Sequence, residues 1–369
     1  MSEIEGLRGN FWPSTRERDL LRFLLHVDEE ESRRSWARWR PGWDPDAPSS
    51  EEYRLYPLLA ERVVALSLAE PHLGMLQGVR RQTTVRNLMY LDQLDDVLAT
   101  LDGAHIGTVV LKGAALVLSV YRNTGIRPFQ DLDVLVDPQR YDEALRLLRA
   151  EGWEALYDYD PGLWDHASSL RRGEVNLDLH RRYSRELVIP GHLDLSWDLT
   201  KSVPAPRALR SGRAVRVLAP TDALLHTLAH GTLARGPVNL RWVADARQLV
   251  ESSDIDWDRL TRLALAFEVA PVIHDALVFV RDTTGVEVPH PPLARLASAT
   301  LPLLARRRLA AFHTFRPTGG LRRIPVEVDR YLELTRHLPA AEVLSHAPHY
   351  VLVEFTWPRV RARLRPRSG

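Results

Sequence analysis

The sequence contains no cysteine, and this absence excludes several kinds of site together. Without thiols the chain can form neither disulfides nor thiolate zinc sites, and it has no cysteine nucleophile. Long apolar runs are also missing: no stretch approaches the roughly 20 residues that a membrane-spanning helix needs. The polar first residues (MSEIEGLRGNFWPS) lack the apolar segment of a secretory signal. These absences predict a cytoplasmic protein.

Lysine is nearly absent: the chain has two, Lys112 and Lys201, and the other 47 basic residues are arginines. A genome-wide preference for arginine explains most of this skew, but a compact ammonium also suits sites that a guanidinium does not fit. The 49 basic residues are balanced by 48 acidic ones, which leaves a net charge of +1. This balance gives no broad attraction for nucleic acid or an anionic membrane.

The 369 residues, of which 45% are apolar and 26% charged, are typical of a folded protein with more than one packed unit. Apolar residues at helical spacing before residue 102 predict an N-terminal helical region, 1–102. Short apolar runs alternating with helical stretches predict an α/β core with a mixed sheet, 103–200. Leucine-rich helical spacing from Thr221 onwards predicts a C-terminal helical region, 201–369.

Within the core, turn residues separate the predicted strands from two helices. Asp137-Pro138 is a favourable start for the second helix, and Gly152 ends it. The last strand alternates cleanly, with apolar residues on one face and polar residues on the other. The predicted strands are Thr108–Leu111, Asp131–Val136, Trp153–Tyr157, Ala167–Arg171 and Glu174–His180, and the helices are Ala114–Tyr121 and Tyr141–Ala150.

Asp131 and Asp133 lie two residues apart on a predicted strand, so both carboxylates point to one face. Such a pair repels and needs a counter-charge, which Mg²⁺ or Mn²⁺ supplies together with substrate phosphates. Asp178 lies on the polar face of the last strand and can complete the set. Three carboxylates on two strands can hold one or two metals that activate a hydroxyl and stabilise a pyrophosphate leaving group.

The phosphate-binding end is predicted at Lys112-Gly113, where a strand meets the helix Ala114–Tyr121. Free backbone N–H groups and the helix dipole favour an anion there, and glycine permits close approach. Arg127 lies four residues before the first aspartate and can reach a triphosphate or support the acidic pair. His180 shares the face of Asp178 and can contact a phosphate or metal-bound water, although a structural role is equally compatible.

The string LKGAALVLSVYRNTGIRPFQDLDVLV resembles the DNA polymerase beta superfamily of nucleotidyltransferases. There, a strand ending at a glycine-containing turn precedes a strand with Asp-x-Asp, and a third acidic residue follows. More narrowly, the LKG turn, the DLDVLV strand and the later segments NLDLH and RWVADARQL resemble a group of uncharacterised nucleotidyltransferases. The resemblance covers roughly residues 80–250.

The resemblance implies transfer of a nucleoside monophosphate from a nucleoside triphosphate to a hydroxyl-type acceptor, with release of pyrophosphate. Asp131 and Asp133 match the metal-binding pair, Asp178 the third carboxylate and Gly113 the first glycine of the turn. The chain departs from the superfamily where Gly-Ser is common, because Ala114 follows Gly113 and a serine contact to phosphate is missing. Lys112 is a candidate replacement for it.

Three other patterns have ordinary structural interpretations. Asp222, His226 and His230 recur every four residues and can face a metal, but packed or capping roles are more common for such residues. Arg241 and Asp245 have the spacing of an intrahelical ion pair. The tryptophans near the N-terminus fit core packing better than a partner surface: Trp12, Trp36, Trp39 and Trp43.

Two rival functions stay open. A glycosyltransferase also uses Asp-x-Asp with a nucleotide-sugar, but a single evident strand precedes Asp131, without the longer nucleotide-binding half of that class. A non-catalytic nucleotide-binding module with the same fold is compatible with the missing serine after Gly113. The acceptor is equally open, with small molecule, peptide, protein and RNA all compatible with the sequence.

Overall fold

The computed structural model describes residues 12–156, 166–184, 187, 200–233 and 239–303, and some positions between 305 and 351. Its centre is a mixed sheet of seven strands in the order β3-β4-β5-β2-β1-β7-β6. The prediction of an α/β fold flanked by helices is confirmed. The strands are β1 Thr108–Val110, β2 Leu132–Val136, β3 Glu154–Ala155, β4 Ala167–Arg172, β5 Val175–His180, β6 Ser202–Pro204 and β7 Arg216–Leu218.

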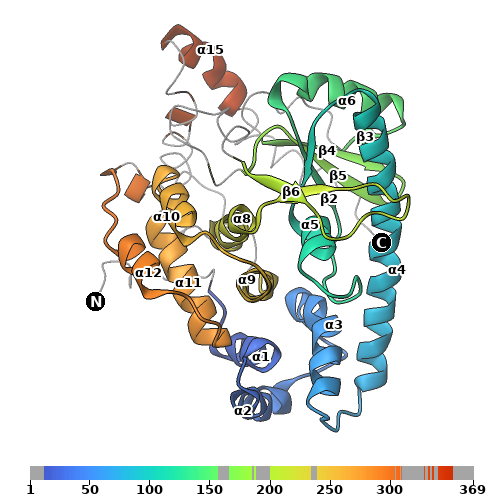
Figure 1. The fold of residues 1–369 in the computed structure, drawn as a ribbon, viewed down its shortest axis with the longest axis vertical. Coiled ribbons are helices and arrows are strands. Elements are labelled where there is room, and N and C mark those ends of the chain that lie inside the picture. Colours follow the sequence, from blue (N-terminus) through green and yellow to red (C-terminus); the bar gives the residue numbers. More distant parts are fainter. Residues whose placement is uncertain are drawn as a thin grey trace.

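Helices surround this sheet and build the lower and left-hand parts of the molecule in Figure 1. Those of the first half of the chain are α1 Thr15–Leu25, α2 Glu29–Trp39, α3 Ser50–Ala65, α4 Leu73–Gly103, α5 Lys112–Ser119 and α6 Tyr141–Ala150. Those of the second half are α8 Pro220–Leu233, α9 Arg241–Ser252, α10 Trp257–Ala266, α11 Ala270–Thr284, α12 His290–Ala297 and α15 Ala340–Val351. No helix among the described residues has both the length and the apolarity to cross a membrane.

Local sequence chemistry explains the element boundaries near the sheet. Asp137 accepts a hydrogen bond from the amide of Gln139, and Pro138 opens the short 3₁₀ turn that leads into α6. The helix α6 then runs over the predicted residues. The strand predicted over 153–157 is observed as the shorter β3, and Tyr157 lies outside the described residues. The chain thus turns after β2 because the Asp137 carboxylate accepts from a free backbone N–H and Pro138 has no N–H that needs a partner.

Two hydrophobic cores divide the molecule. One lies around the sheet and includes the second half of α4 with residues of α5 and α6. The other joins the N-terminal helices to α8, α9, α11 and α12, and Trp39 and Trp43 are buried in it. The sheet itself continues beyond residue 200, because β6 and β7 extend its β1 edge. The three-region division stays a prediction.

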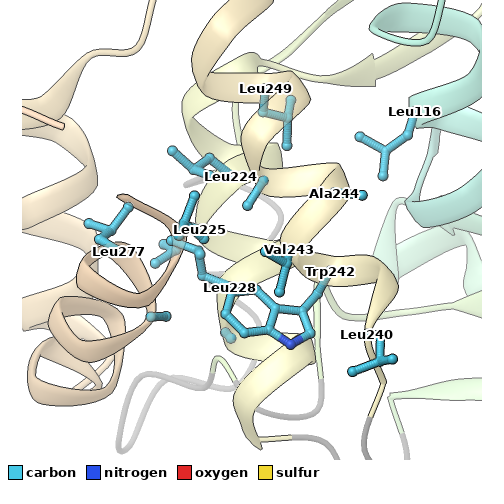
Figure 2. Close-up of a cluster of buried hydrophobic side chains, with 14 of the residues drawn as sticks. Leu116, Leu224, Leu225, Leu228, Leu240, Trp242, Val243, Ala244, Leu249 and Leu277 are labelled. Carbon is cyan, nitrogen blue, oxygen red and sulfur yellow. The ribbon is translucent and has the colours of Figure 1, made fainter. Parts of the chain in front are cut away.

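Helix α9 lies between the two cores. Leu224, Leu225 and Leu228 of α8 pack beside α9, while Leu116 of α5 lies near Ala244 on the other side of that helix (Figure 2). At Gly231 of α8 a β-carbon would collide with the Trp242 ring, so glycine permits this close approach. Through these contacts the C-terminal helices hold α9 against the helix that begins at Lys112.

The helix α4 departs from its predicted packing. Val85, Leu88 and Met89 belong to the helically spaced apolar residues before residue 102, but they are 60%, 49% and 60% exposed. A helix of 31 residues is about 46 Å long, well beyond the width of this short-stranded sheet. Its later turns reach the sheet core, Leu76 near its start is buried in the other core, and Val85, Leu88 and Met89 lie on a face that neither core covers.

Candidate active site

Two parallel strands place Asp133 and Asp178 side by side. The register pairs Asp133 of β2 with Asp178 of β5, and Leu135 with His180. Because side chains alternate along a strand, Asp131 and Asp133 share one face, and Asp178 and His180 share the same face of the neighbouring strand. The alternation predicted for the last strand therefore delivers its polar residues to the aspartate pair.

The Asp133 carboxylate is buried, with 1% of its side chain exposed. Its Oδ1 accepts a hydrogen bond from Lys112 Nζ at 2.6 Å and lies 2.9 Å from His180 Nε2. Its Oδ2 has no hydrogen-bond partner among the described residues, and neither does His180 Nδ1. A buried polar atom without a partner is uncommon in folded proteins and calls for a ligand, an ion or water.

Charge dominates the pKa values at this position. Burial alone would raise the pKa of Asp133, but Lys112 and then His180 outweigh it and hold that pKa well below the ordinary value. Burial would likewise lower the pKa of Lys112, but the carboxylates of Asp133, Asp131 and Asp178 raise it above its usual range. Lys112 is thus a permanent cation that three aspartates attract.

Asp133, Asp178 and His180 offer ligand atoms that all lie within 4.8 Å of one another. We call these three residues together with Lys112 the sheet cluster. Asp178 receives a hydrogen bond from Ser169 Oγ at 2.6 Å on its Oδ1, from the adjacent antiparallel strand β4. The cluster is therefore a buried acidic site that one lysine partly neutralises and that a divalent cation would fit.

Asp131 lies outside that ligand group. It precedes the first residue of β2 and is exposed, although the sequence predicts it as an equal member of the metal-binding pair. The charge of Asp133 is the largest influence on it and raises its pKa. Asp131 therefore stands at the solvent-facing edge of the sheet cluster, within its electric field, and its predicted role as a metal ligand stays a prediction.

Lys112 has an unusual backbone conformation where β1 leads into α5. Its φ is 48°, in the left-handed region that residues with side chains rarely adopt. No side chain caps α5, and no hydrogen bond among the described residues uses the amides of Lys112, Gly113 and Ala114. Successive free amides beside a left-handed residue form a concave anion-binding surface.

Gly113 is tightly enclosed at the same junction. A β-carbon there would collide with the Phe129 side chain and with the Arg127 guanidinium. The sequence predicts that an anion can come close to the backbone at Gly113. On one side of this glycine the space is filled by protein side chains instead. The predicted phosphate-binding residues Lys112, Gly113 and Arg127 do lie together, and their contact with phosphate stays a prediction.

A second group of charges, which we call the loop cluster, consists of Tyr121, Arg127, Arg241 and Asp245. Arg127 donates to both oxygens of Asp245, from Nε at 3.1 Å and from Nη2 at 2.8 Å, and the Tyr121 hydroxyl donates at 2.7 Å. Burial would lower the pKa of Arg127, but Asp245 raises it. Three donors satisfy the Asp245 carboxylate in a buried setting.

The prediction that Arg241 and Asp245 form an ion pair is therefore wrong. Both residues lie on α9, but Arg127 and Tyr121 occupy the carboxylate, and Arg241 Nη1 donates instead to the Pro128 carbonyl at 2.7 Å. A bidentate buried pair is stronger than an exposed pair along one helix, which explains why the distant partner prevails.

The spacing of Asp222, His226 and His230 does not produce a metal site among the described residues. Asp222 accepts hydrogen bonds from Arg259 Nε and Nη2, each at 2.8 Å, and from the Lys201 amide at 3.1 Å. His226 packs against the Tyr183 ring. The packed role is the observed one.

No sequence pattern assigned a role to Ser169, which contacts the sheet cluster, or to Tyr121 of the loop cluster. Ser169 was assigned to a weak strand with no role, although antiparallel pairing of β4 with β5 across Gly173 places it opposite Asp178. Tyr121 and Asp245 come from segments 124 residues apart, and no local pattern signals their contact. Hairpin register was a usable signal for Ser169, and no signal existed for the contact between Tyr121 and Asp245.

The chain belongs to a family described as uncharacterised nucleotidyltransferases, whose model matches residues 42–285. This match spans β1, α5, β2 and β5, which carry the sheet cluster, and also α9 with the loop cluster. The family resemblance read from the sequence is confirmed. No curated protein matches the chain.

Some solved structures are weakly similar. The chain has 15% identity and a TM-score of 0.36 to the solution structure of the antibiotic-resistance factor ANT(2'')-Ia, over 49% of this chain and 92% of that one. It has 18% identity and a TM-score of 0.36 to an antigenic nucleotidyltransferase-like protein from Paracoccidioides brasiliensis, over 58% and 95%. A crystal structure of ANT(2'')-Ia with adenylyl-2''-tobramycin gives 15% identity and 0.33, over 48% and 95%.

Proposed function

We propose that this protein transfers a nucleoside monophosphate from a nucleoside triphosphate to a hydroxyl-type acceptor and releases pyrophosphate. The observation that carries the proposal is the juxtaposition of Asp133 and Asp178 on parallel strands, with a buried carboxylate oxygen that has no described partner. Membership of a nucleotidyltransferase family supports the same chemistry.

The residues of the sheet cluster fit a divalent cation. Asp133 and Asp178 would hold Mg²⁺ or Mn²⁺ through carboxylate oxygens, Asp131 would add a third carboxylate, and His180 would add an imidazole nitrogen. When bound, such a cation polarises phosphoryl oxygens and makes an acceptor hydroxyl more acidic. The imidazole suits Mn²⁺ better than Mg²⁺, whereas the carboxylates suit both.

The phosphates would bind at the start of α5. The amides of Lys112, Gly113 and Ala114 are free of described hydrogen bonds, and the helix dipole favours negative charge there. The ammonium of Lys112 is placed to exchange Asp133 for a phosphate oxygen, because 19% of its side chain is exposed. Arg127, held by Asp245, adds positive charge beside Gly113.

Asp178 is our candidate for removing the acceptor proton, directly or through the metal. Ser169 fixes one of its oxygens, which orients the carboxylate while it stays partly exposed. A base must be oriented and also reachable by the acceptor, and the wholly buried Asp133 does not meet the second condition.

The proposal is tested by mass spectrometry of candidate acceptors after incubation with each nucleoside triphosphate and Mg²⁺ or Mn²⁺. We expect an acceptor heavier by one nucleoside monophosphate, together with pyrophosphate, and no product from Asp133→Asn. Asp137→Asn is the matched control, because Asp137 caps the turn after the same strand. Transfer of a sugar from a nucleotide-sugar would replace the proposal with the glycosyltransferase.

One observation favours a non-catalytic nucleotide-binding module as the second candidate. Lys112 neutralises Asp133, and alanine follows Gly113 where the superfamily commonly has serine. Thermal shift with ATP, with and without Mg²⁺, separates the two. ATP binding that is unchanged in Asp131→Ala and Asp133→Ala, with no transfer to any acceptor, would favour the module.

A further inference from the structure

Arg241 is a cation whose expected partner is occupied. The carboxylate one turn along α9, Asp245, is bound by Arg127 and Tyr121. Among the described residues Arg241 has no carboxylate within ion-pair distance, and its side chain makes one hydrogen bond, from Nη1 to the Pro128 carbonyl. Its buried Nε has no described partner. The guanidinium is thus held in place with most of its donors unused.

The charges around Arg241 do not cancel. Arg54 pairs with Glu51 at 2.9 Å, and Arg127 pairs with Asp245 at 2.8 Å, which leaves Arg241 as the surplus cation of this group. Burial and then the charge of Arg127 lower the pKa of Arg241 to about 10. The group stays positive at neutral pH, and a nearby anion would offset both the cost of burying its charge and its repulsion from Arg127.

The position of this surplus charge is informative. The Pro128 carbonyl accepts from Arg241 and, at 3.4 Å, from Arg127 Nη1, so the two guanidinium groups converge on one atom. The same Arg127 guanidinium lies against Gly113 of α5. Pro128 also lies three residues before Asp131. Arg241 is therefore adjacent to the start of α5, where free amides already favour an anion.

We propose that Arg241 binds the terminal phosphates of the nucleoside triphosphate, and that α9 completes the polyphosphate site from the C-terminal region. This inference rests on the proposed function and assigns one end of its substrate. Arg127 then has a positioning role: it holds Pro128 and Asp245, whereas Arg241 supplies the unused donors. A guanidinium suits this task because its planar donors match two phosphate oxygens.

The test is isothermal titration of the full-length protein with inorganic tripolyphosphate, and with ATP and adenosine in parallel. We expect Arg241→Gln to weaken tripolyphosphate and ATP about tenfold or more and to leave adenosine unchanged, because a charge-assisted hydrogen bond to phosphate is lost. Arg247→Gln is the matched control on the same helix, because Arg247 is already paired with Glu251 at 2.8 Å. It should bind all three as the wild type does.

Three outcomes would overturn the inference. Wild-type affinity of Arg241→Gln for tripolyphosphate shows that Arg241 does not contact the polyphosphate. A raised KM for the acceptor with unchanged affinity for ATP assigns Arg241 to an anionic group of the acceptor instead. Equal loss of adenosine binding in Arg241→Gln indicates a general structural role.

Failure of the proposed function gives a different result. If the wild-type protein binds ATP and tripolyphosphate and Arg241→Gln weakens both, the inference stands even where no acceptor is modified. If transfer occurs and depends on Asp133 but not on Arg241, the function stands and the inference is wrong.

Discussion

The sheet cluster and the loop cluster each contain a buried aspartate, but their carboxylates are satisfied to different degrees. Asp245 of the loop cluster receives three hydrogen bonds on its two oxygens. Asp133 of the sheet cluster has both described partners on Oδ1, and Oδ2 has none. A satisfied buried network stabilises a fold, whereas an incompletely satisfied one costs stability and is typical of a site that receives a ligand.

The same contrast extends to the cations. Arg127 and Asp245 form a bidentate pair that joins the loop before β2 to α9. Removing either residue would leave the other as an unpaired buried charge. Lys112 makes a single ion pair within the described part of the chain and is partly exposed, so its ammonium can exchange partners without unfolding the surroundings. We therefore expect substitution of Asp133 in the sheet cluster to affect activity mainly, and substitution of Arg127 or Asp245 in the loop cluster to affect stability mainly.

The largest expected effect is on catalysis. Asp133→Asn should lower the rate of nucleotidyl transfer by about a thousandfold or more, because it removes the central carboxylate of the predicted metal site. Steady-state kinetics on an identified acceptor measure this, with Asp137→Asn as the control. If Asp133→Asn retained full activity, the sheet cluster would not be the site of chemistry.

The next effect is on folding. Asp245→Ala should lower the free energy of unfolding by about 3–5 kcal/mol, because Arg127 is left as an uncompensated buried charge. Urea denaturation followed by circular dichroism checks this value. Asp258→Ala is a matched control, because that aspartate forms an exposed pair with Arg295 and its loss should leave stability nearly unchanged. Equal losses in the two variants would remove the contrast between the clusters.

Metal dependence should distinguish the clusters again. Lys112→Met should destabilise the metal-free protein by about 2 kcal/mol, since the buried Asp133 loses its main counter-charge. Mn²⁺ should restore more of the melting temperature in Lys112→Met than it adds to the wild type, and a chelator should remove the gain. A variant that is as stable as the wild type in chelator would show that Lys112 does not balance the site.

The smallest expected effect on stability is at Glu31, which lies in a network of charged residues near the surface. It serves as a reference for the effects expected in the two clusters. Hydrogen bonds from Arg34 and then Arg38 lower the pKa of Glu31 to about 2 from 4.5. A carboxyl group with a lowered pKa adds stability above its ordinary pKa, and this stability is lost as the pH falls from about 4.5 to 2.

Because 24% of the Glu31 side chain is exposed, solvent screening limits this contribution to under about 1 kcal/mol. Glu31→Gln should therefore be slightly less stable than the wild type at pH 7. The difference should shrink as the pH approaches 2, as measured by urea denaturation across this range. A difference that is constant with pH would show that the carboxylate charge is not responsible.

Much of the sheet could be predicted because strand periodicity is a local property. The alternation within DLDVLV and within EVNLDLH indicates which residues share a face of the sheet. The start of α6 is predicted by Asp137-Pro138, and its length by its apolar spacing. The juxtaposition of Asp133 and Asp178 follows once β2 and β5 are neighbours, and Lys112 joins them because β1 pairs with β2. Local pattern did not predict that β6 and β7, from beyond residue 200, would extend the sheet.

The partners of the charged residues could not be predicted in the same way. Helical spacing predicts that Asp245 pairs with Arg241, but in the folded chain Asp245 pairs with Arg127, 118 residues away. The spacing of Asp131 and Asp133 suggested equal roles, but Asp133 is buried beside Lys112, and Asp131 is exposed at the edge of the sheet. Burial depends on what covers a strand end, and sequence spacing does not contain that information.

The sequence by itself determined the family, the α/β core and the face on which the acidic residues lie, because these depend on neighbours within one strand or helix. The tertiary structure alone decided which carboxylate is left unsatisfied, which arginine is left unpaired and how α9 reaches the start of α5. The physical reason is that two buried cores must pack against each other before distant charges can meet, and the strength of an ion pair depends on the burial that this packing creates.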